Sequence, residues 1–162
     1  SRLYQEIREN RGLAYTVSAA AVSFSDTGLL TIYAGTAPES LTELLPIIGD
    51  EMRKTAATVS AEEVARARAQ LTAGLVMSLE SPTSRIEQMA RQSLVLGRTL
   101  ETDEVLANVE AVDCDHVLKI VHSMLQNQPT IAVLGPVEGF EKVPSLAARC
   151  GLNDQPLPAA AC

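Results

Sequence analysis

Residues 1–15 read SRLYQEIRENRGLAY and combine a charged helical segment, a glycine break and the first residues of a strand. Tyr4, Ile7 and Arg8 lie close to helical spacing, which predicts a helix to about residue 10. Gly12 is expected to end this helix, because glycine readily adopts the left-handed conformation found after helix ends. Residues 13–24 then alternate small and β-branched side chains, a pattern that predicts a strand.

The next stretch indicates that this strand belongs to a hairpin. Residues 25–28, Ser-Asp-Thr-Gly, are a turn signal. Residues 29–35, LLTIYAG, predict a second strand, and so short a connection favours antiparallel pairing.

Five helical segments are predicted after the hairpin, including a short one near residues 102–109. Pro46 is expected to kink the first, because proline removes a backbone donor and crowds the preceding turn. Their start and stop signals are, in chain order, Pro38, Ser60 with Glu63, Ser81-Pro82, Gly97 and Asp113. The residues expected on their apolar faces are Leu41, Leu44, Leu45, Ile48, Val64, Ala67, Leu71, Leu75, Leu79, Ile86, Met89, Ala90, Leu94, Val117, Ile120, Val121 and Met124.

A last strand is predicted over residues 130–134, TIAVL, before Gly135-Pro136. Strands at both ends with helices between them predict an α+β fold, an antiparallel sheet with helices packed on one face. We expect one domain over residues 1–143 and a partly disordered tail over residues 144–162, where prolines occur without a periodic pattern. The chain starts with Ser1 inside a predicted helix, so we expect it to be a piece of a longer protein.

The composition argues against nucleic-acid-binding, membrane-spanning and secreted proteins. The 162 residues carry a formal net charge of −7, which argues against a binder of nucleic-acid phosphates. No apolar run approaches the roughly 20 residues needed to span a bilayer, and no secretory signal is visible. Three cysteines without a metal-binding spacing are typical of reduced thiols in a cytoplasmic protein.

Few residues in the chain are candidates for catalysis or metal binding. His116 and His122 lie six apart on a predicted helix and point to different faces, and no carboxylate lies between them, so we expect no metal ligand here. A dyad of Cys114 with His116 is disfavoured by its bland helical context. Arg8 and Tyr15 remain, seven residues apart across the glycine break. They could stabilise an oxyanion or grip a peptide carbonyl, or they could be ordinary surface residues.

Four segments in order carry a resemblance to a known family. They are SRLYQEIRENRGLAY, FSDTGLLTIYAGT, EEVARARAQLTAGLVMSLESPTSRIEQMARQ and TIAVLGPV. Over residues 1–143 the chain resembles the C-terminal half of M16-family zinc metallopeptidases. The branch it is most similar to holds bacterial processing-type peptidases and the mitochondrial processing peptidase β subunit.

The resemblance implies a LuxS/MPP-like metallohydrolase half-domain that is incomplete at its N-terminus. Such proteins have two similar α+β halves, and the N-terminal half holds zinc through an HxxEH motif. The C-terminal half contributes an arginine and a tyrosine spaced R-x6-Y, which Arg8 and Tyr15 match. Arg11 matches a commonly basic position without a catalytic role.

The same resemblance implies that this chain holds no metal or other cofactor and does not hydrolyse peptides alone. Zinc is expected in an N-terminal half or in a partner subunit. That half could belong to the same polypeptide, or the subunits could form a homo- or heterodimer. The expected substrate is a peptide. The expected function is the substrate-binding half of a zinc metalloendopeptidase. The alternative is a non-catalytic structural or interaction subunit that kept the fold and lost the chemistry.

Overall fold

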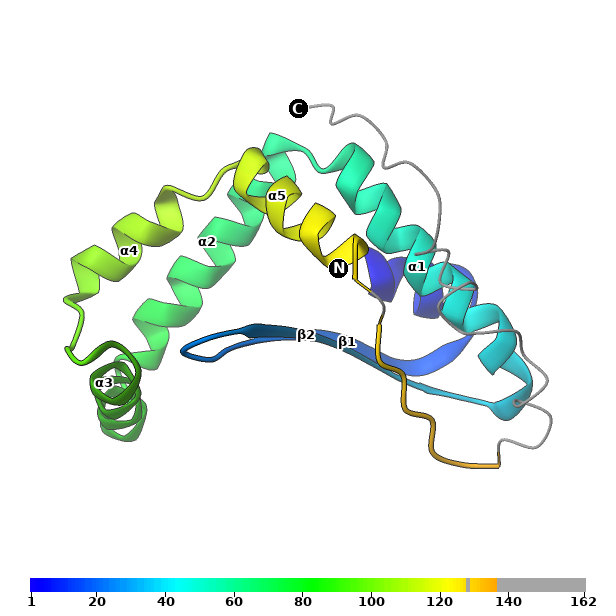
Figure 1. Ribbon diagram of the computed structural model, residues 1–162, viewed down its shortest axis with the longest axis horizontal. Coiled ribbons are helices and arrows are strands. Elements are labelled where there is room, and N and C mark those ends of the chain that lie inside the picture. The colour runs from blue at the N-terminus through cyan, green and yellow to red at the C-terminus, as the bar shows by residue number, and fades with distance from the viewer. Residues whose placement is uncertain (128, 137–162) are drawn as a thin grey trace. The chain divides into compact units, whose positions relative to one another are not determined.

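The structure is a computed structural model, and it describes residues 1–127 and 129–136 (Figure 1). The chain begins with the π-helix η1, Tyr4–Asn10, followed by strands β1, Ala14–Ser23, and β2, Gly28–Thr36. The short 3-10 helix η2, Pro38–Ser40, leads into α1, Leu41–Thr58. The remaining helices are α2, Ala61–Ser78, α3, Pro82–Leu96, α4, Thr102–Glu110, and α5, Cys114–Leu125. β1 and β2 pair as a two-stranded antiparallel sheet, so the expected α+β class is confirmed.

The described residues divide into two compact units. Unit 1 contains residues 1–22, residues 29–58 and the described residues from 118 onward. Unit 2 contains residues 23–28 and 59–117. Unit 1 therefore holds η1, most of the hairpin and α1, whereas unit 2 holds α2, α3 and α4.

The core of unit 1 joins its first helix, its sheet and α1. Ile7 of η1 is completely buried and clusters with Ala14 and Val17 of β1 and with Leu44 and Ile47 of α1. Each large aliphatic side chain buried in this way stabilises the fold by about 1.5–3 kcal/mol. This cluster fixes η1 and α1 against one face of β1, and thereby fixes the residues on either side of Gly12.

Local signals read from the sequence set the helix ends in unit 2. Ser60 and Glu63 form the expected capping box, with Glu63 N donating to Ser60 Oγ over 3.3 Å and Ser60 N donating to Glu63 Oε2 over 3.1 Å. Ser81 caps α3 by accepting from Ser84 N over 3.3 Å. Gly97 ends α3 with a φ of +71°, a conformation that glycine adopts without steric cost.

The strand predicted over residues 130–134 is wrong. These residues belong to no strand, and the sheet of the described residues contains only β1 and β2. A β-strand is stable only when a neighbour accepts and donates its ladder of hydrogen bonds, so an apolar, β-branched sequence is not sufficient by itself.

The apolar faces expected on α2 and α3 are largely exposed in the structure. Val64 is the only residue of α2 that is buried, and no residue of α3 is. Leu71, Ile86 and Leu94 keep 62%, 67% and 87% of their surface exposed. A helical apolar stripe is buried only where a second layer covers it, and the described part of unit 2 provides no sheet of its own to do so. The stripe of α1 is confirmed by buried Leu44 and Leu45.

Three further expectations concern Pro46, the C-terminal tail and membrane-spanning helices. Pro46 lies inside α1, which continues through it as one helix. The expected tail, residues 144–162, lies outside the described residues. None of the helices in the described part of the chain combines the length and apolar character needed to cross a membrane.

Candidate functional site

The site candidate is built on the connection between η1 and β1. Gly12 has a φ of +63°, as expected for a residue that ends a helix in the left-handed region. Leu13 N donates to the Ile7 carbonyl over 2.9 Å and closes the end of the helix. Ile7 and Ala14 are buried in the core, whereas their chain neighbours Arg8 and Tyr15 are exposed.

Arg8 lies in the last turn of η1 and is half exposed. Its side chain keeps 46% of its surface accessible, and its guanidinium carbon lies 5.0 Å from the centroid of the Tyr4 ring. This is the geometry of a cation–π contact, which holds a cation without using its hydrogen-bond donors. Its Nε also lies 3.9 Å from Glu9 Oε1, at the outer limit of an ion pair. Arg8 is thus oriented by an aromatic surface while donors remain available to a ligand.

Arg11, three residues later, is held differently. Its Nε donates to Glu6 Oε1 over 2.7 Å, and its Nη1 lies 3.6 Å from Glu43 Oε1 of α1. The pKa of Glu6 is lowered by hydrogen bonds from Asn10 and Arg11, in that order. Arg11 therefore ties the end of η1 to α1.

Tyr15 is the second residue of β1 and keeps 73% of its surface exposed. Its ring lies over Gly35 of β2: a Cβ placed on Gly35 would be 2.7 Å from Cζ and 2.8 Å from Oη of Tyr15. Within the described residues no hydrogen bond involves the Tyr15 hydroxyl. The hydroxyl end of the phenol is therefore the part that lies against Gly35, and its donor is not used by another described residue.

The structure places both predicted site residues in unit 1, on either side of Gly12, and exposes both. No direct contact joins them among the described residues, so a ligand would have to bridge them. Gly35 was missed by the sequence reasoning, which treated it only as the last residue of a strand. A glycine in a strand interior was the available signal, because such a residue often marks a close approach by another group.

The described residues do not fit a metal ion. No group of three or more His, Cys, Asp or Glu side chains in residues 1–127 and 129–136 could hold one. His116 is exposed, and its Nδ1 lies 2.6 Å from Asp113 Oδ1 at the start of α5.

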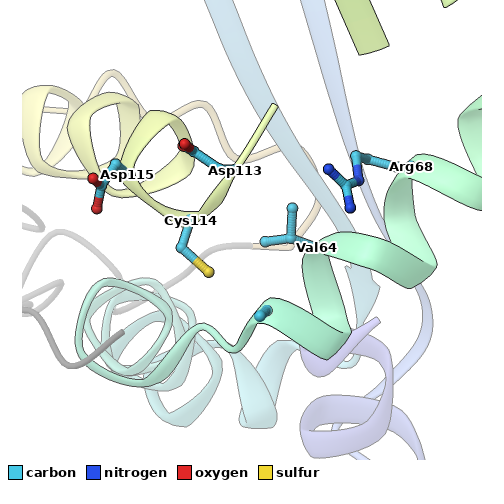
Figure 2. Close-up of a pocket in the computed structure, with 6 residues that line it drawn as sticks. Val64, Arg68, Asp113, Cys114 and Asp115 are labelled. Atoms are coloured by element: carbon cyan, nitrogen blue, oxygen red, sulfur yellow. The ribbon is translucent and has the colours of Figure 1, made fainter. Parts of the chain in front are cut away.

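A separate cavity of about 290 Å³ lies within unit 2 (Figure 2). Its lining residues are Ala61, Val64, Arg68, Asp113, Cys114 and Asp115. Arg68 Nη1 donates to the carbonyls of Glu110 and Val112 over 2.8 and 3.1 Å, so it ties α2 to the connection between α4 and α5. Because its arginine already bonds to the backbone and its cysteine is buried, this cavity has the character of a packing defect at a helix junction.

Comparisons with known proteins point to one family. The profile of the peptidase M16 inactive domain matches residues 1–71. An uncharacterized zinc protease of Streptomyces coelicolor is 34% identical over 139 residues, which are 85% of this chain and 30% of that protein. An uncharacterized zinc protease of Bacillus subtilis is 30% identical over 141 residues, 84% of this chain and 34% of that protein. The chain thus spans about a third of the length of these relatives.

A solved structure supports the fold. A chain of Complex III2 from Candida albicans, determined with Inz-5 bound, superposes with a TM-score of 0.67 over 75% of this chain and 29% of that chain. At 22% identity this likeness concerns the fold alone. The profile, the relatives and the fold agree, and the chain is therefore similar to the C-terminal half of peptidase M16 proteins.

Proposed function

We propose that this chain is part of the substrate-binding half of an M16 zinc peptidase, in which Arg8 and Tyr15 act on the substrate. The observation that carries the proposal is the pair itself. Both side chains are exposed, they lie on either side of the left-handed Gly12, and neither uses its donors in a hydrogen bond within the described residues. The zinc proteases among its relatives support the reaction class.

The chemistry follows from the two donor types. Attack of water on a peptide bond forms a tetrahedral intermediate whose former carbonyl oxygen carries negative charge. A hydroxyl hydrogen bond aimed at that oxygen stabilises the transition state more than the substrate, so it raises kcat. We assign this donation to Tyr15. The planar guanidinium of Arg8 offers several donors in a fixed arrangement, which suits it to hold substrate carbonyl oxygens.

The proposal places zinc and its HxxEH ligands in another half of the same protein or in a partner subunit. The chain alone is then a binding module, and the peptide is cleaved only in the assembled protein. A cytoplasmic location belongs to the same proposal, since sparse cysteines without a metal-binding spacing favour a reducing compartment.

The test is Tyr15→Phe in the assembled, zinc-loaded peptidase. We expect kcat to fall by about 10²-fold or more, as when one oxyanion donor is removed, with little change in KM. Tyr33→Phe is the matched control, because Tyr33 is an exposed tyrosine of β2 at 60% accessibility. Peptide cleavage by Tyr15→Phe at the wild-type rate would refute the assigned role.

The alternative is a structural or interaction subunit that lost the chemistry. Kinetic measurements on the same assembled protein distinguish it from the first proposal. The alternative is compatible with the description of the matched profile as an inactive domain. Under this alternative, Arg8 and Tyr15 substitutions leave the activity of the assembled protein unchanged.

A further inference from the structure

Gly35 of β2 is buried, and what covers it is the exposed Tyr15. A Cβ on Gly35 would lie 2.7 Å from Tyr15 Cζ, 2.8 Å from Tyr15 Oη and 2.9 Å from Thr16 Cγ2. Non-bonded carbon atoms settle at about 3.5–4.0 Å, so no side chain larger than hydrogen fits beneath the ring.

The need for glycine here comes from space and not from the backbone. The described glycines with positive φ are Gly12, Gly97 and Gly135, and Gly35 is not among them. An L-residue could therefore adopt the backbone conformation of Gly35. What a substitution would meet is the phenol ring of Tyr15 and the methyl group of Thr16.

The local course of β1 explains why two neighbouring side chains meet one glycine. Ala14 and Val17 both point into the core although they are three residues apart. Strict alternation along a strand would place residues three apart on opposite faces. β1 therefore departs from strict alternation of buried residues between Ala14 and Val17. Tyr15 and Thr16 lie in this stretch, and atoms of both side chains come close to the Cβ position of Gly35.

We propose that Gly35 is a positioning residue for Tyr15: its bare backbone is the surface on which the phenol lies, and this fixes where the hydroxyl is presented. A tyrosine that is 73% exposed would otherwise sample several rotamers, and holding it in one removes that entropy cost before substrate arrives. Small displacements of a reacting group lower rates strongly, by as much as about 10²-fold for 1 Å. The inference rests on the proposed function of Tyr15.

The test is Gly35→Ala in the assembled peptidase, with Gly74→Ala as the matched control. Gly74 lies in α2, and a Cβ there meets nothing within 4 Å. We expect Gly35→Ala to lower kcat by about tenfold to 10²-fold with KM unchanged, because the displaced hydroxyl acts in the transition state. Gly74→Ala should keep the wild-type kcat.

A spectroscopic readout separates displacement of the ring from general damage. In protein labelled with 3-fluorotyrosine, the fluorine NMR signal of Tyr15 is assigned by its loss in Tyr15→Phe. We expect Gly35→Ala to shift this signal and Gly74→Ala to leave it in place. An unmoved Tyr15 signal in Gly35→Ala would overturn the inference.

A double-mutant cycle ties the effect to the hydroxyl. If Gly35 acts through Tyr15, adding Gly35→Ala to Tyr15→Phe should lower kcat little further. Full additivity would overturn the positioning role. If Gly35→Ala fails to fold, Thr16→Ser with Gly35→Ala removes the methyl collision and leaves only the ring contact, and the same kcat loss and signal shift are expected.

The two proposals fail in different ways. Wild-type turnover in Tyr15→Phe overturns the proposed function, and with it any catalytic meaning of Gly35. A loss of kcat in Tyr15→Phe together with wild-type kcat in Gly35→Ala overturns the role of Gly35 alone.

Discussion

At the scale of single residues, the two arginines near the end of η1 differ in what occupies their donors. Arg11 is engaged by Glu6 and Glu43, whereas Arg8 lies over the Tyr4 ring and keeps its donors accessible. In the sequence both are basic residues near a glycine; Arg8 was singled out by its pairing with Tyr15 across the glycine break, and the family spacing R-x6-Y strengthened that choice. The structure adds a physical reason, because a stacked guanidinium is oriented without being consumed.

Arg8→Ala is therefore expected to weaken substrate use. A hydrogen bond to a charged group contributes about 1.5–3 kcal/mol, so kcat/KM of the assembled peptidase should fall by about tenfold to 10²-fold. Steady-state kinetics with a peptide substrate measures this. Arg66→Ala, which removes an exposed arginine paired with Glu62 in α2, is the control and should retain the wild-type kcat/KM. Equal values for both variants would contradict a role of Arg8 in binding.

At the scale of elements, the residue that caps a helix N-terminus can be predicted from a few neighbouring residues. α5 begins at Cys114 with Asp113 before it, and Asp113 Oδ1 accepts from His116 N over 3.0 Å. The ring of His116 lies 2.6 Å from the same oxygen. The cap was predictable because it depends on residues three apart, whereas the strand over residues 130–134 depended on a distant partner.

The Asp113 cap predicts a pH dependence of stability. Hydrogen bonds from the His116 backbone and then from its side chain lower the pKa of Asp113 below its ordinary value of 3.8. The folded state thus favours the charged carboxylate, so the cap stabilises the fold at neutral pH and this contribution is lost as the pH falls through the lowered pKa. Asp113→Asn keeps an acceptor but does not titrate. Denaturant unfolding at a series of pH values should show a shallower loss of stability below about pH 4 in this variant. Identical slopes would contradict the prediction.

At the scale of the whole molecule, the chain has one well-packed unit and one with much exposed apolar surface. Unit 1 has a core that joins η1, β1 and α1, while α3 buries none of its residues. The chain spans about a third of its zinc-protease relatives, and the described residues hold no metal-binding group. Under the proposed function, Arg8 and Tyr15 form one part of a larger site.

The zinc content of the isolated chain tests this division. We expect the 162-residue chain to bind zinc only substoichiometrically in equilibrium dialysis, because its two histidines do not converge with other ligands in the described residues. The assembled protein, dialysed in parallel, should retain zinc. One zinc per isolated chain would contradict the assignment of the metal to another half.

The sequence by itself determined the features that depend on near neighbours. Three such features are the break at Gly12, the hairpin and the capping box at Ser60, which follow from short-range patterns of glycine, polar caps and periodicity. Only the tertiary structure decided which apolar faces are covered, buried for Leu44 and exposed for Ile86, and that Tyr15 lies over Gly35. These last features require segments separated along the chain to meet, and pairing between distant residues is not encoded in any local pattern.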